Sequence, residues 1–321
     1  MARVKIEMKN NRQKTFDEAY DEFLRYCKVR NLRPATIKHY EDIVDYSFYK
    51  FLDYKFNTYK VETNSIKLQL IEDYIIYCKE ETSVKDITIN TNVIGMRAIL
   101  YYFMKLGYTE EFKISPLRID KPIIETYTDV ELKILLVKPN LEKCSFIEYR
   151  NWIIVNFLLS TGCRLSTLLN VAICDLDFEN ELITYTHTKN RRGQIIPMSN
   201  TLKTVLLGYL EFRQPDDKGD YLFCNAYGKQ LTSNLLSQNL VSYNKKRGVL
   251  KTGIHRFRHT FAKKWIMNKG DIFRLQKLLG HSDMAIVKNY VEMFTEDLQK
   301  DFNEFNPLET IGGKRTYIKL K

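Results

Sequence analysis

The sequence has few cysteines, and they form no metal-binding pattern. Its 321 residues include only six cysteines, with no CxxC pair; they stand at positions 27, 78, 144, 163, 174 and 224. A zinc site needs closely spaced ligand pairs, so neither zinc nor another cofactor is expected. Scattered single thiols in a chain of this length predict a reducing compartment and burial as small hydrophobic side chains.

The sequence also lacks long apolar runs, internal repeats and low-complexity tracts. No run approaches the roughly 18 apolar residues that identify a membrane-spanning helix. The first residues, Met1 to Lys9, are charged and contain no apolar segment of the kind that a secretory signal requires. We therefore expect a cytoplasmic protein without a membrane partner.

Basic residues are in excess, and the excess is uneven. The formal net charge is +11 and the sequence pI is about 9.1. Residues 1–110 contain 18 basic and 16 acidic residues, whereas the rest of the chain contains 32 and 23. A protein this basic usually meets a polyanion, most often nucleic acid, although charge alone is equally consistent with a solubility bias. The larger C-terminal part holds most of the charge that would attract the polyanion.

The N-terminal part has the pattern of a small helical bundle. Thr15 and Glu18 have the spacing of a capping box, and Pro34 fits the first turn of a second helix. Apolar residues at helical spacing predict four helices, which begin at Thr15 and Pro34 and then span about 65–79 and 88–106, the last ending at Gly107. Residues 107–125 have no sustained period and contain Pro116 and Pro122, which is typical of a linker.

Beyond the linker the pattern is mainly helical with one hairpin. Residues 181–188 and 194–198 alternate as strands around a polar turn at Lys189–Gly193. The expected helices span about 128–138, 146–160, 200–212, 233–247, 255–268, 271–279 and 284–292. The predicted fold class is therefore mainly α with a small β-hairpin or sheet in the second domain.

Three segments carry residues suited to phosphate chemistry. His255 and Arg258 are three apart on a predicted helix and share a face, where a guanidinium can hold phosphate oxygens and an imidazole can move a proton. Arg164 stands where one helix ends at Gly162 and another begins, next to free backbone N–H groups. Each has a structural alternative: a surface basic helix for the first pair, and an arginine bracing a helix turn for Arg164.

The third segment contains His281 and Tyr290. On one continuous helix, residues nine apart would point in roughly opposite directions. Gly280 and the capping residues Ser282 and Asp283 interrupt that helix, so both side chains can face one cavity. Alone the pair indicates little, because the chain has 21 tyrosines.

Five elements follow one another along the chain: Arg164, the segment 188–197 (TKNRRGQIIP), the HxxR pair, Leu-Gly-His and a tyrosine nine residues on. In this order they resemble the tyrosine recombinases, a family that includes phage and transposon integrases and Xer-type recombinases. The resemblance is specific over about 128–295 and looser over the N-terminal bundle. It implies a SAM-like core-binding bundle and a catalytic domain. The implied segments are a basic leader (1–14), the core-binding domain (15–107), a linker (108–125), the catalytic domain (126–296) and a C-terminal helix or tail (297–321). No separate arm-binding domain is expected.

The resemblance also implies roles for individual residues. Tyr290 would be the nucleophile, Arg164 and Arg258 would clamp the scissile phosphate, and Lys189 would be the general acid. His255 and His281 would activate or hydrogen-bond the reacting groups. The reaction would pass through a 3′-phosphotyrosyl intermediate and need neither ATP nor metal.

One position departs from the family pattern, and the assignment of the general acid has alternatives close by. Many members have Glu or Asp where this chain has Thr167, and that acid usually supports its neighbours rather than reacts. Arg191 and Arg192 share the predicted turn with Lys189, but Lys189 has the better spacing to Pro197, which lies eight residues on.

The implied partner is double-stranded DNA, gripped by both domains, with four protomers on two sites. The candidate DNA contacts are Arg30, Arg33, Lys38, Arg97, Arg191, Arg192, Lys245, Lys246, Arg247 and Arg256. The C-terminal Leu298, Phe302 and Phe305 would share a face, which would pack on a neighbouring protomer or on its own domain. An accessory DNA-bending or directionality protein is compatible with the family.

The favoured function is site-specific recombination for integration or excision of a phage or mobile element. A catalytically silent DNA-binding regulator on the same fold is the alternative. A type IB topoisomerase is the third choice, which the small N-terminal bundle disfavours.

Overall fold

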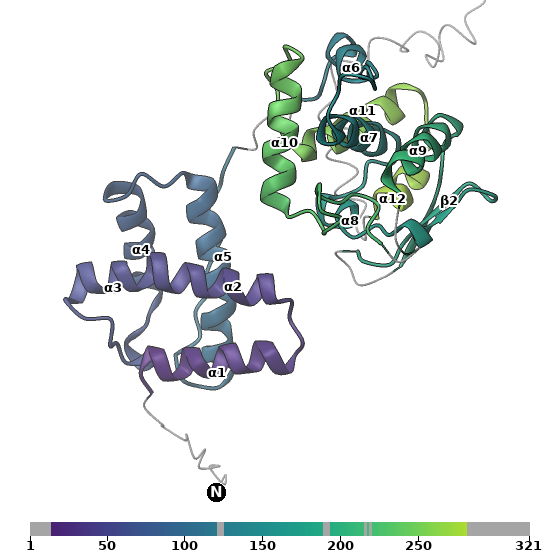
Figure 1. Ribbon diagram of the computed structural model, residues 1–321. Helices are drawn as coiled ribbons and strands as arrows, with labels where there is room; N and C mark the ends of the chain where they lie inside the picture. Colours follow the sequence, from purple (N-terminus) through teal and green to yellow (C-terminus); the bar gives the residue numbers. More distant parts are fainter. Residues whose placement is uncertain (1–13, 121–124, 189–192, 215–216, 218–219, 281–321) are drawn as a thin grey trace, which may run out of the picture. The chain divides into compact units, whose positions relative to one another are not determined.

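The computed structural model describes residues 14–120, 125–188, 193–214, 217 and 220–280. The chain divides into two compact units, residues 1–121 and 122–321 (Figure 1). The division falls inside the segment that the sequence pattern marks as a linker. The exact boundaries of the five segments named above stay predictions.

The N-terminal unit is built from helices whose ends follow their capping residues. Its helices are α1 (Phe16–Val29), α2 (Pro34–Ile43), α3 (Tyr49–Phe56), α4 (Leu68–Glu80) and α5 (Asp86–Lys105). Both halves of the predicted capping box are present, since the Thr15 side chain accepts from the Glu18 N–H and the Glu18 carboxylate accepts from the Thr15 N–H. Pro34 occupies the first turn of α2, as predicted.

Two expectations for this unit need correction. The second helix does not run uniformly, because a π-helical segment, Val44–Phe48, joins α2 to α3. The third helix begins at Leu68 rather than at residue 65, and Thr63–Ser65 form a separate 3₁₀ turn before it. The buried sides of these helices meet in one core rich in aromatic rings, in which Phe16 and Phe48 have centroids 5.1 Å apart.

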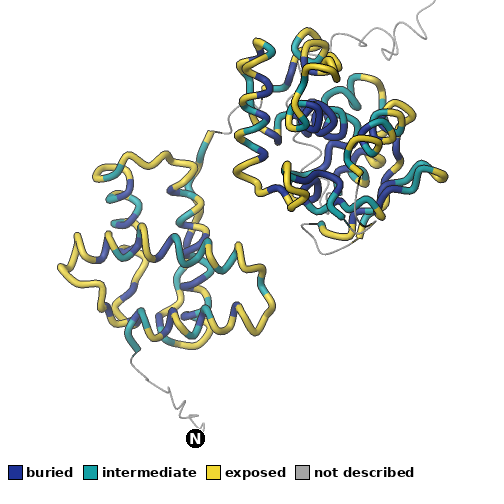
Figure 2. The backbone as a smooth tube through the Cα atoms, in the orientation of Figure 1, coloured by how far each residue is buried: buried dark blue, intermediate teal, exposed yellow. Residues whose placement is uncertain are grey.

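The second unit surrounds one central helix. Its helices are α6 (Asp129–Leu135), α7 (Phe146–Thr161), α8 (Leu165–Leu168), α9 (Asn200–Arg213), α10 (Ser233–Lys246), α11 (Ile254–Met267) and α12 (Ile272–Leu279). Helix α7 is buried over most of its length and packs against α9, α10 and α11 (Figures 1 and 2). Helix α6 is shorter than the predicted 128–138, since Leu136 already ends it. The expected helix at 284–292 lies outside the described residues.

A three-stranded antiparallel sheet, in the order β1-β2-β3, flanks the helices. The predicted hairpin corresponds to β2 (Leu182–Tyr185) and β3 (Gln194–Pro197), and β1 (Leu176–Asp177) adds a strand that the sequence pattern did not predict. Ile183 pairs with Ile196 and Tyr185 with Gln194. Because directly opposite residues share a face and Ile183, Tyr185 and Ile196 are buried, Gln194 lies on the inward face of the sheet.

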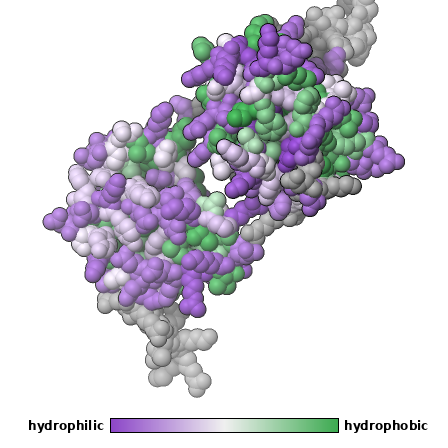
Figure 3. Space-filling model, in the orientation of Figure 1, coloured by the Kyte–Doolittle hydropathy of each residue, from purple (hydrophilic) through white to green (hydrophobic). Residues whose placement is uncertain are grey.

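The surfaces of both units are mainly hydrophilic in the view of Figure 3. Within the described ranges, no helix has the length and apolar character needed to cross a membrane, and no group of three or more His, Cys, Asp or Glu side chains could hold a metal ion. All six cysteines are free thiols. The prediction that they are buried is wrong for Cys174, which is exposed, and Cys144 is only half-buried.

Candidate active site

Among the predicted site residues that the structure describes, Arg258 is the most deeply enclosed. It lies on the core-facing side of α11, next to the buried Phe257, and is 5% exposed. Its Nη1 donates to the Gly162 carbonyl at 2.9 Å and its Nη2 to the Leu279 carbonyl at 2.7 Å. Both acceptors are neutral, so these bonds orient the guanidinium without neutralising its charge.

Arg164 approaches the same place from a different element. Helix α7 ends at Gly162, which has a left-handed backbone (φ 59°), and Arg164 is the N-cap residue of α8. Its Nη1 lies 3.5 Å from the Gly280 carbonyl oxygen, directly after the end of α12. The sequence therefore located the helix junction correctly, and the arginine there is half-buried.

The two arginines line one cleft of about 330 Å³. The other walls come from α8, the β2–β3 hairpin and the end of α12, and they include Thr167, Thr188, Gln194, Lys277 and Gly280. Two guanidinium groups that face one water-accessible space can hold a phosphate through several N–H donors. The cleft is therefore suited to binding a phosphodiester.

Cys163 and Tyr185 line this cleft but are unsuited to act as nucleophiles. Burial raises the pKa of the Cys163 thiol to about 11, so the thiol stays protonated near neutral pH. Burial also raises the pKa of the Tyr185 phenol well above its usual value. Tyr185 is therefore a structural residue of the cleft wall.

The remaining predicted site residues are not all described. Lys189, Arg191, Arg192, His281 and Tyr290 lie outside the described residues. His255 is exposed in the first turn of α11, and it is outside the set of described residues that line the cleft. The structure thus brings Arg164 and Arg258 together, while the roles of all these residues stay predictions.

Comparison with known proteins identifies the family. The model of the phage integrase family matches residues 130–296, which include this whole cleft. Tyrosine recombinase XerA of Thermococcus onnurineus is 32% identical over 211 residues, which cover 64% of this chain and 71% of the relative. The chain belongs to the phage integrase family. It is a tyrosine recombinase, an enzyme that cleaves and rejoins DNA.

Further comparisons extend the likeness over most of the chain. Tyrosine recombinase XerA of Pyrococcus furiosus is 28% identical over 311 residues, which cover 94% of this chain and all of the relative. The solved integrase of transposon Tn1549, in complex with circular intermediate DNA, is similar in fold. It has a TM-score of 0.69 at 20% identity and covers 88% of this chain and 98% of that chain. The mainly helical fold with two parts is thus the fold of known tyrosine recombinases.

Thr167 stands where many tyrosine recombinases have an acid. It is 5% exposed in α8, one turn after Arg164, and it lines the cleft. Its backbone N–H donates to the Arg164 carbonyl at 3.0 Å. The threonine adds no negative charge beside the two arginines.

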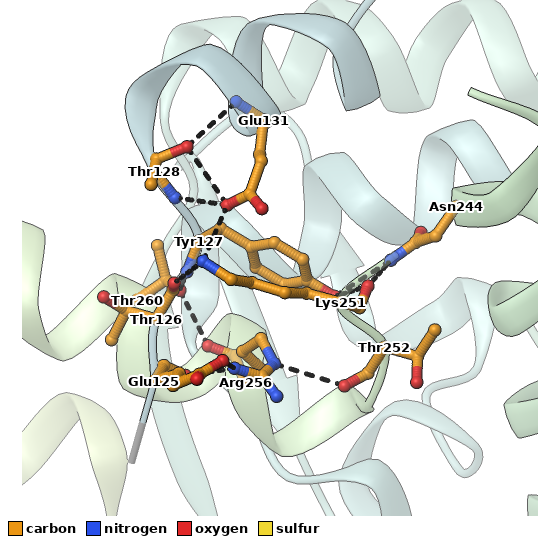
Figure 4. Close-up of polar contacts among 10 residues, drawn as sticks. All are labelled: Glu125, Thr126, Tyr127, Thr128, Glu131, Asn244, Lys251, Thr252, Arg256 and Thr260. Carbon is orange, nitrogen blue, oxygen red and sulfur yellow. Dashed lines mark hydrogen bonds and ion pairs between the residues drawn. The ribbon is translucent and has the colours of Figure 1, made fainter. Parts of the chain in front are cut away.

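A polar network joins α11 to the segment that precedes α6 (Figure 4). Arg256 donates to the Glu125 carbonyl at 2.8 Å and forms an ion pair with its carboxylate at 3.1 Å. The Tyr127 N–H donates to the Thr260 hydroxyl at 3.0 Å, and the Tyr127 ring packs on Phe257 with centroids 4.6 Å apart. Segment 125–127 therefore anchors the helix that carries Arg258.

The residues predicted to contact DNA differ in their exposure and in their contacts within the chain. Arg256 is engaged with Glu125, as above, and Lys38 forms an ion pair with Asp42 at 3.1 Å. Arg247 forms an ion pair with Glu148 at 3.1 Å and lies over the Tyr243 ring at 3.9 Å. By contrast, Lys245 and Lys246 are exposed in the last turn of α10, and Arg30 is exposed at the end of α1. Arg33 is also exposed, whereas Arg97 is half-buried.

Residue-based reasoning overlooked two described residues near the arginines. Gln194 lies in the segment 188–197 and lines the cleft. The signal that could have identified it as a site residue is a polar side chain at an inward-facing strand position. His259 follows Arg258, and burial, then His255, Arg258 and Arg256, lower its pKa to about 4. His259 is therefore neutral near neutral pH.

Proposed function

We propose that this chain is a site-specific recombinase that integrates or excises a mobile DNA element through a 3′-phosphotyrosyl intermediate. The observation that carries the proposal is the convergence of Arg164 and Arg258 on one cleft, in the part of the chain that matches the integrase family. Two guanidinium groups can offset the charge that grows on the phosphoryl oxygens, which is usually the largest contribution to such catalysis.

In the proposed reaction the Tyr290 oxygen attacks the scissile phosphorus. The bond from phosphorus to the 5′ oxygen breaks as the new phosphotyrosyl bond forms, and Lys189 gives a proton to the departing 5′ oxygen. A phenol has an ordinary pKa near 10, so attack at neutral pH needs a proton acceptor and local positive charge. His255 and His281 are the candidates for the proton acceptor, and the two arginines supply positive charge. A 5′ hydroxyl from the partner strand then attacks the phosphotyrosine, restores the phosphodiester and releases the tyrosine.

The energy of the broken phosphodiester is kept in the phosphotyrosyl bond, so resealing needs neither ATP nor a metal ion. The substrate is double-stranded DNA, which the basic surplus of the C-terminal part favours. We propose four protomers on two DNA sites, active in alternating pairs. Cross-linking on DNA that carries two sites would reveal tetramers, and recovery of dimers alone would contradict this assembly.

The decisive test is a nicked suicide substrate that carries the element's own end sequence. The wild-type chain is expected to form a covalent protein–DNA adduct, and Tyr290→Phe is expected to form none while it still binds. Tight binding without any adduct, unchanged by that substitution, would support the alternative of a catalytically silent regulator. Relaxation of supercoils without pairing of two sites would support a topoisomerase.

A further inference from the structure

The C-terminal end of α12 accepts side-chain donors from three separate elements. The Gln194 amide nitrogen in β3 donates to the Lys277 carbonyl at 2.5 Å and to the Leu278 carbonyl at 3.0 Å. Arg258 of α11 donates to the next carbonyl, at Leu279, and Arg164 lies 3.5 Å from the one after it, at Gly280. Four successive carbonyls thus face the hairpin and both arginines.

Helix geometry explains why these donors gather there. The last carbonyls of a helix have no partner within the helix and carry a partial negative charge, so they attract N–H donors. Gly280 has a left-handed backbone (φ 60°) that ends α12. A Cβ atom at this position would lie 2.7 Å from Gln194 Oε1 and 3.7 Å from Arg164 Nη1, so the three residues are closely packed.

Gln194 is the hairpin's attachment to this helix end. It opposes Tyr185 on the inward face of the sheet, and the hairpin turn that contains Lys189 lies directly before it in sequence. At the opposite end of the hairpin, Lys203 of α9 forms an ion pair with Glu181 at 3.0 Å. Besides its pairing with β1 and its packing in the core, the hairpin is therefore held at both ends, and the Gln194 contact joins it to the helix end that also accepts from the arginines.

We infer that Gln194 is a positioning residue for strand cleavage, which fixes the β2–β3 hairpin against the end of α12 beside Arg164 and Arg258. The inference rests on the proposed function, in which the hairpin supplies the general acid and the arginines hold the phosphate. Each hydrogen bond makes only a small net contribution to stability. A displacement of about 1 Å at a reacting group, however, can slow a reaction by about 100-fold.

Gln194→Met tests the inference because it keeps the length of the side chain and removes both N–H donors. We expect DNA affinity to stay within about twofold and cleavage to slow by about 10- to 100-fold. The step expected to slow in this variant is the protonation of the leaving 5′ oxygen. A substrate with sulfur at that bridging position releases a thiolate, which leaves far more readily than an alkoxide and does not need the general acid. Gln194→Met should therefore cleave the sulfur substrate at nearly the wild-type rate.

Three further variants make the result specific. Gln194→Leu also lacks the N–H donors, adds no charge beside the arginines and should repeat the defect, so the conclusion does not depend on the folding of one variant. Gln194→His keeps one neutral N–H donor near the carbonyls and should restore part of the rate on the oxygen substrate. Lys203→Met removes the other attachment of the hairpin and should lower the melting temperature without changing the ratio of the two cleavage rates.

The outcomes separate this inference from the proposed function. Wild-type cleavage of the oxygen substrate by Gln194→Met, or equal slowing on both substrates, would overturn the positioning role and leave the recombinase proposal intact. Failure of the wild-type chain to form any adduct would overturn both. Selective rescue by the sulfur substrate supports the inference.

Discussion

The buried guanidinium of Arg258 donates to the carbonyl of Gly162, the residue that ends α7, at 2.9 Å. The same guanidinium donates to Leu279 at the end of α12. Two helix C-termini therefore meet at one side chain, and their partial negative charge favours a cation there. These two bonds set the direction of the Arg258 guanidinium beside the cleft.

Replacement of Arg258 by lysine should abolish most strand cleavage. An ammonium group lacks the planar fork that reaches both carbonyls, so the charge loses its fixed direction. We expect adduct formation to fall by about 100-fold or more, as when one oriented donor to a transition state is removed.

Arg164→Ala should have a similar effect, and a gel-shift assay should show that DNA binding largely survives in both. Arg256→Lys, on the same helix, is the matched control and should affect stability more than cleavage. Near-normal cleavage by Arg258→Lys or Arg164→Ala would remove that residue from the proposed clamp.

Gly162→Ala should destabilise the second unit. Its φ of 59° is unfavourable for a residue with a side chain, and the added Cβ would lie 2.4 Å from a Phe261 ring carbon and 3.0 Å from Leu279. We expect a loss of about 1–3 kcal/mol in the free energy of unfolding, measured by denaturant titration. Gly228→Ala is the control, because its φ of 76° gives similar strain with nothing within 4 Å of the new atom. Equal losses in the two variants would mean that crowding at Gly162 is unimportant.

Stability should decrease as the pH falls below about 6.5. In the folded chain the pKa of His259 is lowered from 6.5 to about 4, first by burial and then by His255, Arg258 and Arg256. Between these values the unfolded chain binds a proton that the folded chain does not, so stability present above 6.5 is lost as the pH falls toward 4. Thermal melts from pH 7 to pH 4.5 should show a smaller drop for His259→Gln than for the wild type. An unchanged pH profile in the variant would show that another group is responsible.

Lys245 and Lys246 should contribute to DNA affinity through phosphate contacts. Both are exposed at the end of α10, where a backbone phosphate can reach them. If both make such contacts, Lys245→Gln with Lys246→Gln should reduce the slope of log affinity against log salt concentration by about 0.9 per contact. Arg247→Gln is the comparison, because Arg247 is engaged with Glu148 and Tyr243. It should lower the melting temperature and leave the slope unchanged. A smaller slope for Arg247→Gln alone would assign the contact to that residue instead.

Local patterns predicted most of the helices. The Thr15–Glu18 capping box and Pro34 located helix starts correctly, because capping depends on residues a few positions apart. The π-helical segment at Val44–Phe48 escaped prediction, since it differs from an α-helix only in hydrogen-bond spacing. The two-residue strand β1 was missed because it is too short for an alternating pattern to be recognised.

The sequence by itself determined the order of the elements, the positions of Arg164 and Arg258 at or near helix starts, and the family. The tertiary structure alone decided that Arg164, Gln194 and Arg258 meet at the end of α12, and that Arg256 and Arg247 are held by Glu125 and Glu148. Helical periodicity and capping depend on residues that are close in sequence. The bonds from Gln194 and Arg164 to the end of α12, in contrast, join residues 83 and 116 positions apart, and only packing of the folded chain brings those atoms together.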